Sequence, residues 1–216
     1  MIAIEKFPNR IQAGRLLATL LEDLRGPRTV VLGLARGGVV VAREVADHLE
    51  APLGVLVARK IGAPQAPEFA LGAIAPGARV LDQPTVEASG VPPRDLEAVI
   101  AAEERELARR MARYQAGRPD LPLENRVVIL VDDGLATGRT AQAAIESVRR
   151  HDPRRVVYAA PVCSREGRAA LRGRADDVVC LHSPEQFFAV GEWYEDFSQT
   201  SDEDVLACLS RVPASA

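Results

Sequence analysis

The sequence has few aromatic residues and almost no lysine. Phenylalanine, tryptophan and tyrosine make up 4% of its 216 residues, against 47% for all apolar residues together. We therefore expect one sizeable core packed by aliphatic side chains. Of the 27 basic residues, Lys6 and Lys60 are the two lysines, which leaves 25 arginines. A lysine in such a chain is a candidate for a role that a guanidinium does not fill.

Strong positive charge and long apolar runs are also absent. A formal net charge of −3 argues against a nucleic-acid binder, which normally carries a basic face. The apolar runs fall well short of the roughly 20 residues of a membrane span. The opening residues, MIAIEKFPNR, lack the apolar stretch of a secretory signal. We therefore expect a cytoplasmic protein that binds neither nucleic acid nor membranes.

The cysteines are few. Cys163, Cys180 and Cys208 are odd in number, widely spaced and outside any CxxC pattern. This spacing favours neither a disulfide framework nor a cysteine zinc site. We interpret the three residues as small buried hydrophobic side chains in a reducing compartment.

The period of the apolar residues alternates between that of helices and that of strands, which predicts an α/β fold. Residues 62–78 are rich in glycine and proline and are not expected to form one regular element. We find no repeat or long linker and expect a single domain over residues 1–216. The pattern predicts strands at 29–34, 53–58, 126–131, 155–162 and 177–182, a return strand after residue 78, and a long helix over 95–115.

The tail, residues 184–216, differs from the rest because it concentrates aromatic and acidic residues. Thr200 and Glu203 have the spacing of a capping box, which predicts a terminal helix that begins after Thr200.

The most informative stretch is VVILVDDGLATGRTAQAA, residues 127–144. An apolar strand delivers two adjacent carboxylates, Asp132 and Asp133, and the loop from Gly134 to Thr140 then leads into a helix. Backbone amides in such a loop, at the positive end of a helix, bind a phosphate. A carboxylate pair accepts two vicinal sugar hydroxyls and also holds a hydrated Mg²⁺. The stretch therefore predicts a site for a phosphorylated sugar.

Other phosphate motifs fit this stretch poorly. A Walker loop needs a lysine that the segment from Gly134 to Thr140 lacks, and in a Rossmann fingerprint the acid follows the glycines instead of preceding them. A surface loop capped by Asp and Thr explains one acid and one hydroxyl, but not two acids at the end of a buried strand.

The positions from Val128 to Thr140 resemble the signature of type I phosphoribosyltransferases, an apolar strand followed by two acids and Thr-Gly-x-Thr. The resemblance implies a three-layer α/β/α fold with a mainly parallel sheet and a small hood. It also implies that the acids contact the ribose hydroxyls and that the loop binds the 5-phosphate of 5-phosphoribosyl-1-pyrophosphate (PRPP). The implied PRPP-binding residues are Asp132, Asp133, Gly134, Ala136, Thr137, Gly138, Arg139 and Thr140.

Two more segments resemble parts of this family. The loop Ala35-Arg36-Gly37-Gly38 closes the first strand and resembles the pyrophosphate loop. Arg59 and Lys60, which end the second strand, resemble the base of the mobile loop that covers the site, and Glu68 lies within that loop. Arg36 and Lys60 also remain open to interpretation as ordinary solvated side chains.

The resemblance implies that the tail at 184–216, with the N-terminus, forms the hood that holds the acceptor. Trp193 lies in this tail, and either stacking on a base or packing between tail and core accounts for it.

The family activity is transfer of the phosphoribosyl group from PRPP to an acceptor, here expected to be a purine-like base. Arg36, Lys60 and Asp133 are the expected catalytic residues. Mg²⁺ is expected to be held by the substrate and water, without a direct protein ligand. The expected partners are PRPP and the small acceptor, and a homo-oligomer stays open. The alternative is a non-catalytic sensor of PRPP or a nucleotide on the same fold.

Overall fold

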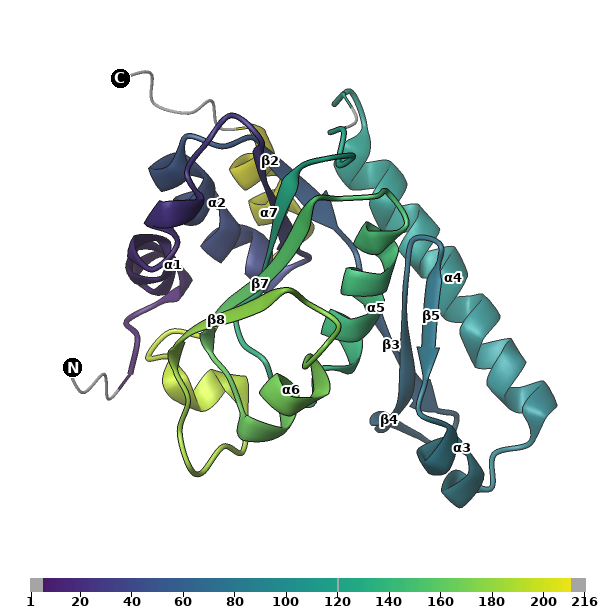
Figure 1. Cartoon of the computed structure of the whole chain (residues 1–216). Coiled ribbons are helices and arrows are strands. Elements are labelled where there is room, and N and C mark those ends of the chain that lie inside the picture. The colour runs from purple at the N-terminus through teal and green to yellow at the C-terminus, as the bar shows by residue number, and fades with distance from the viewer. Residues whose placement is uncertain (1–5, 120, 211–216) are drawn as a thin grey trace.

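Five parallel strands form the main sheet, in the order β2-β1-β6-β7-β8 (Figure 1). The protein is represented by a computed structural model that describes residues 6–119 and 121–210. A parallel sheet is covered on both faces, which explains why its strands are continuous apolar runs. The strands are β1 (Thr29–Leu34), β2 (Leu53–Leu56), β6 (Val127–Val131), β7 (Arg155–Val162) and β8 (Asp177–His182), close to the predicted ranges.

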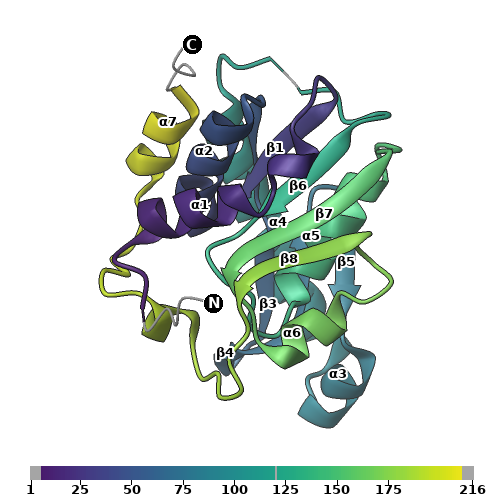
Figure 2. The ribbon, with the colours of Figure 1, turned by 60° about the vertical axis from the view of Figure 1, so that its left-hand side comes forward.

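Helices cover both faces of this sheet, so the predicted three-layer α/β/α architecture is confirmed (Figure 2). Along β1, Val31 packs with α1 (Arg10–Thr19) and α2 (Gly37–Leu49), whereas Val30 faces α5 (Arg139–Arg149) on the opposite side. Neighbouring strand residues point to opposite faces, which is why adjacent valines serve different layers. The short helices α6 (Arg165–Ala170) and η1 (Glu22–Leu24) complete these layers.

A second, antiparallel sheet lies beside the first and contains β3 (Arg59–Ala63), β4 (Ala66–Ala75) and β5 (Ala78–Leu81). Residues 62–78 are thus not one element, as predicted, but they do form regular strands. Ile61 and Leu71 are fully buried beneath α4 (Pro93–Gln115), and this packing supports the hairpin despite its glycines and prolines. The predicted return strand is β5. It ends where Asp82 caps the helix α3 (Gln83–Ser89), which the sequence pattern did not predict.

Residues 184–210 of the tail contact two separate parts of the protein. The 3-10 helix η2 (Val190–Trp193) is followed by Tyr194, which forms a bridge with Phe7 near the N-terminus. The terminal helix α7 (Asp202–Ser210) lies beside α2 (Figure 2). The capping box that opens it is one residue later than predicted, because the Ser201 hydroxyl accepts from the Asp204 amide at 3.1 Å and the Asp204 carboxylate accepts from the Ser201 amide at 2.8 Å.

The expectation of three reduced cysteines is wrong for two of them. Cys163 and Cys180 form a disulfide, and Cys208 is free. Cys163 directly follows β7 and Cys180 lies in the adjacent strand β8, so strand pairing brings together two residues that are 17 positions apart. No helix within the described ranges is long and apolar enough to cross a membrane.

Candidate functional site

The candidate site lies where β1 and β6 end, and these two strands are neighbours in the sheet. The segment from Ala35 to Gly38 leaves β1, and the peptide bond between Ala35 and Arg36 is cis. A Cβ added at Gly37 would lie 1.9 Å from Oδ2 of Asp133, and one added at Gly38 would lie 2.6 Å from the Val131 carbonyl oxygen. Glycine at both positions therefore lets this loop lie directly against the acid pair.

Asp132 is the more deeply placed of the two acids. Its Oδ1 accepts from the Asp133 amide at 2.9 Å, and its Oδ2 accepts from the Tyr158 hydroxyl at 3.2 Å. Burial, and next the nearby Asp133, raise the pKa of Asp132 well above its usual range. Burial likewise raises the pKa of Tyr158, so its hydroxyl remains a donor. A cation or hydroxyl donors bound in the site would therefore stabilise the ionised form of the Asp132 carboxyl.

Asp133 is held by residues from both ends of the chain. Arg10 Nε donates to Asp133 Oδ2 at 2.8 Å, and the Tyr194 hydroxyl donates to the Asp133 carbonyl at 2.6 Å. The Arg10 guanidinium also lies 3.9 Å from the ring centroid of Phe197 and donates to the Ser198 carbonyl at 2.9 Å. The N-terminal helix α1 and the tail therefore both hold Asp133 in place.

Arg10, Tyr158 and Tyr194 were not among the predicted site residues. The chain contains three tyrosines, and Tyr158 stands in an otherwise aliphatic strand, which was an available signal for a polar task. No local pattern marks Arg10, because its partner Asp133 is 123 residues away.

A loop connects β6 with α5 as predicted, but it ends at Gly138, because Arg139 and Thr140 already belong to the first turn of α5. Gly138 occupies the N-cap of α5 at φ +80°, a left-handed conformation that favours glycine, and no side chain caps the helix. The first amides of α5 have no partner within the helix, so they remain available to an anion. The Ser164 hydroxyl donates a hydrogen bond to the Ala136 carbonyl and so stabilises the conformation of the loop. Thr137 is exposed and Thr140 is half-buried.

Arg139 takes a different position from the rest of its loop. Its guanidinium donates to the carboxylate of Asp82, the capping residue of α3. The Thr85 amide first, and Arg139 next, lower the pKa of Asp82. The side chain of Arg139 is therefore paired with the N-cap of α3, directly after β5 of the small sheet.

Arg59, Lys60 and Glu68 all belong to the small sheet. Lys60 pairs with Ala73 of β4, so it lies within a strand instead of at the edge of a loose loop. Its Nζ is 2.8 Å from Oε2 of Glu68, a side chain that is 98% exposed, and the hydrogen bond from Lys60 lowers the pKa of Glu68. Arg59 pairs with Glu103 of α4. Over the described part of the chain, no hydrogen bond or ion pair joins Lys60 to either acid.

Trp193 lies half-buried at the junction of the tail and the main sheet. Its ring centroid is 4.7 Å from that of His182, at the end of β8, and its neighbours include Phe7 and Val162. The indole nitrogen has no hydrogen-bond partner among the described residues. These contacts favour the interpretation that Trp193 packs the tail against the main sheet.

The carboxyl oxygens of Asp132 and Asp133 suit a divalent cation whose other ligands are water and oxygen atoms of a bound molecule. Among the described residues there is no group of three or more His, Cys, Asp and Glu side chains suited to a metal. The adjacent carboxyls of Asp132 and Asp133 offer hard oxygen ligands, as Mg²⁺ prefers. A divalent cation at this place would complete its coordination with water and ligand oxygens.

Comparison with known proteins identifies the relatives of this sequence. The model of the family described as phosphoribosyl transferase domain matches residues 3–197. Proteins of two Mycobacterium tuberculosis strains, CDC 1551 / Oshkosh and H37Rv, are named "putative phosphoribosyl transferase", and each is 48% identical over 206 residues. The match covers 95% of this chain and 46% of each relative, so the chain spans about half the length of these relatives.

Solved structures share the fold. The crystal structure of TT1426 from Thermus thermophilus is 46% identical, with a TM-score of 0.78 over 94% of this chain and 97% of that chain. A purine phosphoribosyltransferase from Pyrococcus horikoshii is 16% identical, with a TM-score of 0.50 over 91% of this chain and 97% of that chain. At this identity the second similarity concerns the fold alone.

Proposed function

The chain belongs to the phosphoribosyltransferase family, and from this membership we propose that it transfers the 5-phosphoribosyl group of PRPP to a nitrogenous base and releases pyrophosphate. One observation carries the proposal. The acid pair at the end of β6 lies directly against the Gly37-Gly38 loop at the end of β1, and the uncapped first turn of α5 follows the same acids.

Each part of this crevice suits one part of PRPP. The free amides at the start of α5 bind the 5-phosphate. Asp132 and Asp133 accept hydrogen bonds from the two ribose hydroxyls and so orient the sugar. The amides of the Ala35–Gly38 loop and the Arg36 guanidinium bind the pyrophosphate. Mg²⁺, when bound with PRPP, neutralises charge on the phosphate oxygens.

The reaction breaks the bond between C1 of the ribose and the pyrophosphate oxygen, and forms a bond from C1 to a nitrogen of the acceptor, whose proton is released to water. Positive charge develops on the sugar ring while negative charge collects on the departing pyrophosphate. Arg36 and Lys60 stabilise this negative charge, and no covalent intermediate with the protein is required. A purine-like base is the acceptor that we propose, because the resemblance to the family favours it.

A non-catalytic sensor of PRPP is the second candidate, and the pairing of Lys60 with Glu68 favours it. A sensor needs affinity for PRPP but no free cation for the leaving group. Release of pyrophosphate from PRPP, assayed across a panel of bases, separates the two candidates.

Thermal unfolding with PRPP and Mg²⁺ tests the proposed site. At about one hundred times the dissociation constant, the ligand is expected to add roughly 2.7 kcal/mol to the free energy of unfolding. The double change Asp132→Asn and Asp133→Asn preserves shape but removes both carboxyl groups, so most of this gain should disappear. An unchanged gain in the double variant would place the ligand elsewhere. An equal gain with inorganic phosphate would reduce the site to a phosphate cradle.

Lys60→Ala is expected to lower turnover by about tenfold while it changes the dissociation constant of the nucleotide product little, since its charge is needed most as pyrophosphate leaves. Steady-state kinetics and product binding measure the two effects. Glu68→Gln is the matched variant, because it frees the same ammonium and should preserve turnover. Full turnover of Lys60→Ala with several bases would contradict the assigned role.

A further inference from the structure

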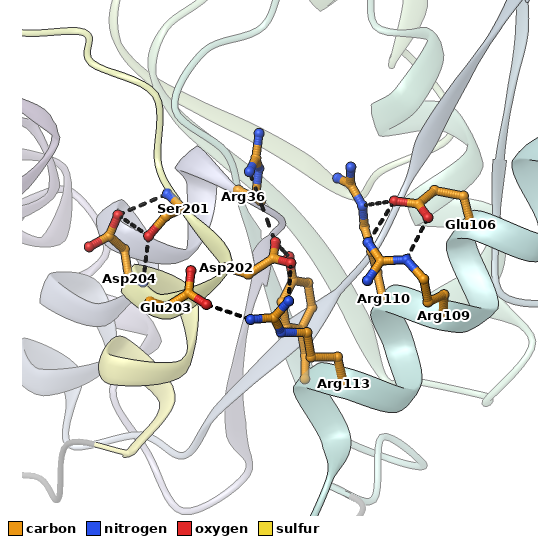
Figure 3. Close-up of polar contacts among 10 residues, drawn as sticks. Arg36, Glu106, Arg109, Arg110, Arg113, Ser201, Asp202, Glu203 and Asp204 are labelled. Atoms are coloured by element: carbon orange, nitrogen blue, oxygen red, sulfur yellow. Dashed lines mark hydrogen bonds and ion pairs between the residues drawn. The ribbon is translucent and has the colours of Figure 1, made fainter.

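Asp202, the first residue of the tail helix α7, lies among side chains from two other parts of the protein (Figure 3). Its Oδ1 accepts a hydrogen bond from the Tyr114 hydroxyl at 2.6 Å, and its Oδ2 pairs with Nη1 of Arg113 at 3.0 Å. Both of these partners belong to α4. The third neighbour is Arg36 of the pyrophosphate loop, whose Nη1 lies 3.9 Å from Oδ1. The carboxylate therefore joins the tail, α4 and the loop that ends β1.

This carboxylate is a fixed anion. The side chain of Asp202 is 14% exposed, and Tyr114 is fully buried. The Tyr114 hydrogen bond first, and then the charges of Arg113, Arg110 and Arg36, lower the pKa of Asp202. Burial and the same bond raise the pKa of Tyr114 to about 12, so its hydroxyl stays a donor. Asp202 is thus held by α4 whether or not Arg36 approaches it.

Arg36 differs from the other arginines of similar burial. At 3.9 Å from Asp202 it is attracted by charge but makes no hydrogen bond, and its side chain donates to no other residue in the described part of the chain. Four arginines whose side chains are 11–23% exposed, against 25% for Arg36, each donate to a carboxylate: Arg10, Arg59, Arg110 and Arg139. The guanidinium N–H groups of Arg36 are therefore available to hydrogen-bond an anion.

The helix that carries Asp202 is fixed to the helix that begins beside Arg36. Val205 of α7, Val39 in the first turn of α2 and Tyr114 of α4 share one buried apolar cluster. Any displacement of α7 would disturb this packing, so the distance from the carboxylate to the pyrophosphate loop is set by a rigid contact.

We infer that Asp202 is a positioning residue for the leaving group, which holds the Arg36 guanidinium in the pyrophosphate loop by charge alone and leaves its donors for pyrophosphate. The inference rests on the proposed function, because it takes pyrophosphate to be the ligand of Arg36. It gives the tail helix a task at the leaving group, whereas the tail was expected to form a hood over the acceptor.

The test is the affinity for pyrophosphate with Mg²⁺, measured by calorimetry on the full chain. Asp202→Asn retains an acceptor for Tyr114 but removes the charge, and it is expected to weaken binding by about tenfold. Glu203→Gln is the matched control. It removes the same charge one residue later, from a side chain that also pairs with Arg113 but not with Arg36, and a change below about twofold is expected.

Asp202→Asn is then combined with Arg36→Gln in a double variant, and its pyrophosphate affinity is compared with that of Arg36→Gln alone. If Asp202 acts through Arg36, then Asp202→Asn should alter binding by less than about twofold in that background. Two results would overturn the inference. Tighter binding in both backgrounds would mean that Asp202 merely repels the anion, and an equal loss in both would mean that it only supports the fold.

A measurement without ligand separates this inference from the proposed function. In NMR spectra the Nε–Hε group of Arg36 should become more mobile in Asp202→Asn, while that of Arg113, which still pairs with Glu203, should not. Unchanged order at Arg36 would refute the positioning role. A wild-type protein that binds neither PRPP nor pyrophosphate would refute the proposed function, and the NMR result alone would then decide whether Asp202 orders Arg36.

Discussion

Replacing Asp132 with Asn is expected to stabilise the unliganded protein at pH 7 by on the order of a few kcal/mol and, at the same time, to remove most of its affinity for PRPP. The physical reason is that Asp132 is a half-buried carboxyl, desolvated by the protein around it and next to a second acid, and both conditions oppose its ionisation. An amide keeps the acceptor that faces the Asp133 amide and avoids the cost of the charge. The site would thus lose function as the fold gains stability.

The sign of the pH dependence follows from the raised pKa of Asp132 in the folded protein. A carboxyl with a raised folded pKa binds its proton more tightly when folded, so its contribution favours folding below the unfolded pKa of about 4. This contribution is lost as the pH rises from there toward the folded pKa. Wild type should therefore lose stability over that range, while Asp132→Asn should not.

Urea unfolding between about pH 4 and pH 8 measures both proteins. Their free energies should agree at the acidic end and diverge toward neutrality. Asp133→Asn serves as the control, because it leaves Arg10 without its charged partner and should not stabilise. If Asp132→Asn is less stable than wild type at every pH in this range, the Asp132 carboxyl does not destabilise the fold, and the prediction is wrong.

Arg36→Gln is expected to lower turnover by roughly 10²- to 10³-fold, because the guanidinium faces charge that develops only as pyrophosphate departs. The Michaelis constant of the acceptor should change little, since in the proposed reaction Arg36 acts on the pyrophosphate and not on the acceptor. Arg15→Gln is a suitable control. It removes the same charge from an exposed arginine that pairs with Glu44 of α2, away from the loop. Normal turnover in Arg36→Gln would shift the leaving-group role to Lys60 or the loop amides.

The main sheet and its acid-bearing loop could be predicted from the sequence because their signals are local. A strand buried on both faces is a continuous apolar run, and β6 ends directly before the two adjacent acids. The small sheet could not be predicted in the same way. Its glycines and prolines indicate irregular structure, and only the burial of Ile61 and Leu71 beneath α4 explains why strands form.

The contacts that were missed are long-range. Arg10 meets Asp133 across 123 positions, and Tyr114 meets Asp202 across 88. The disulfide depends on the register of β7 against β8, which the spacing of Cys163 and Cys180 does not reveal. The glycine- and threonine-containing loop after β6 is a property of one segment, whereas the surroundings of the acids are a property of the whole fold.

The close approach of the Gly37-Gly38 loop to the acid pair limits how this sequence can evolve. A methyl group at Gly38 would collide with the backbone of β6, which is fixed by its neighbours, so that position is closed to substitution by the fold itself. A methyl group at Gly37 would collide with the Asp133 carboxylate and with Arg10, both side chains. A lineage that no longer needed the acid could shorten it and then accept a larger residue at Gly37. Loss of Gly37 together with Asp133 would therefore mark descendants that keep this fold after abandoning its ligand.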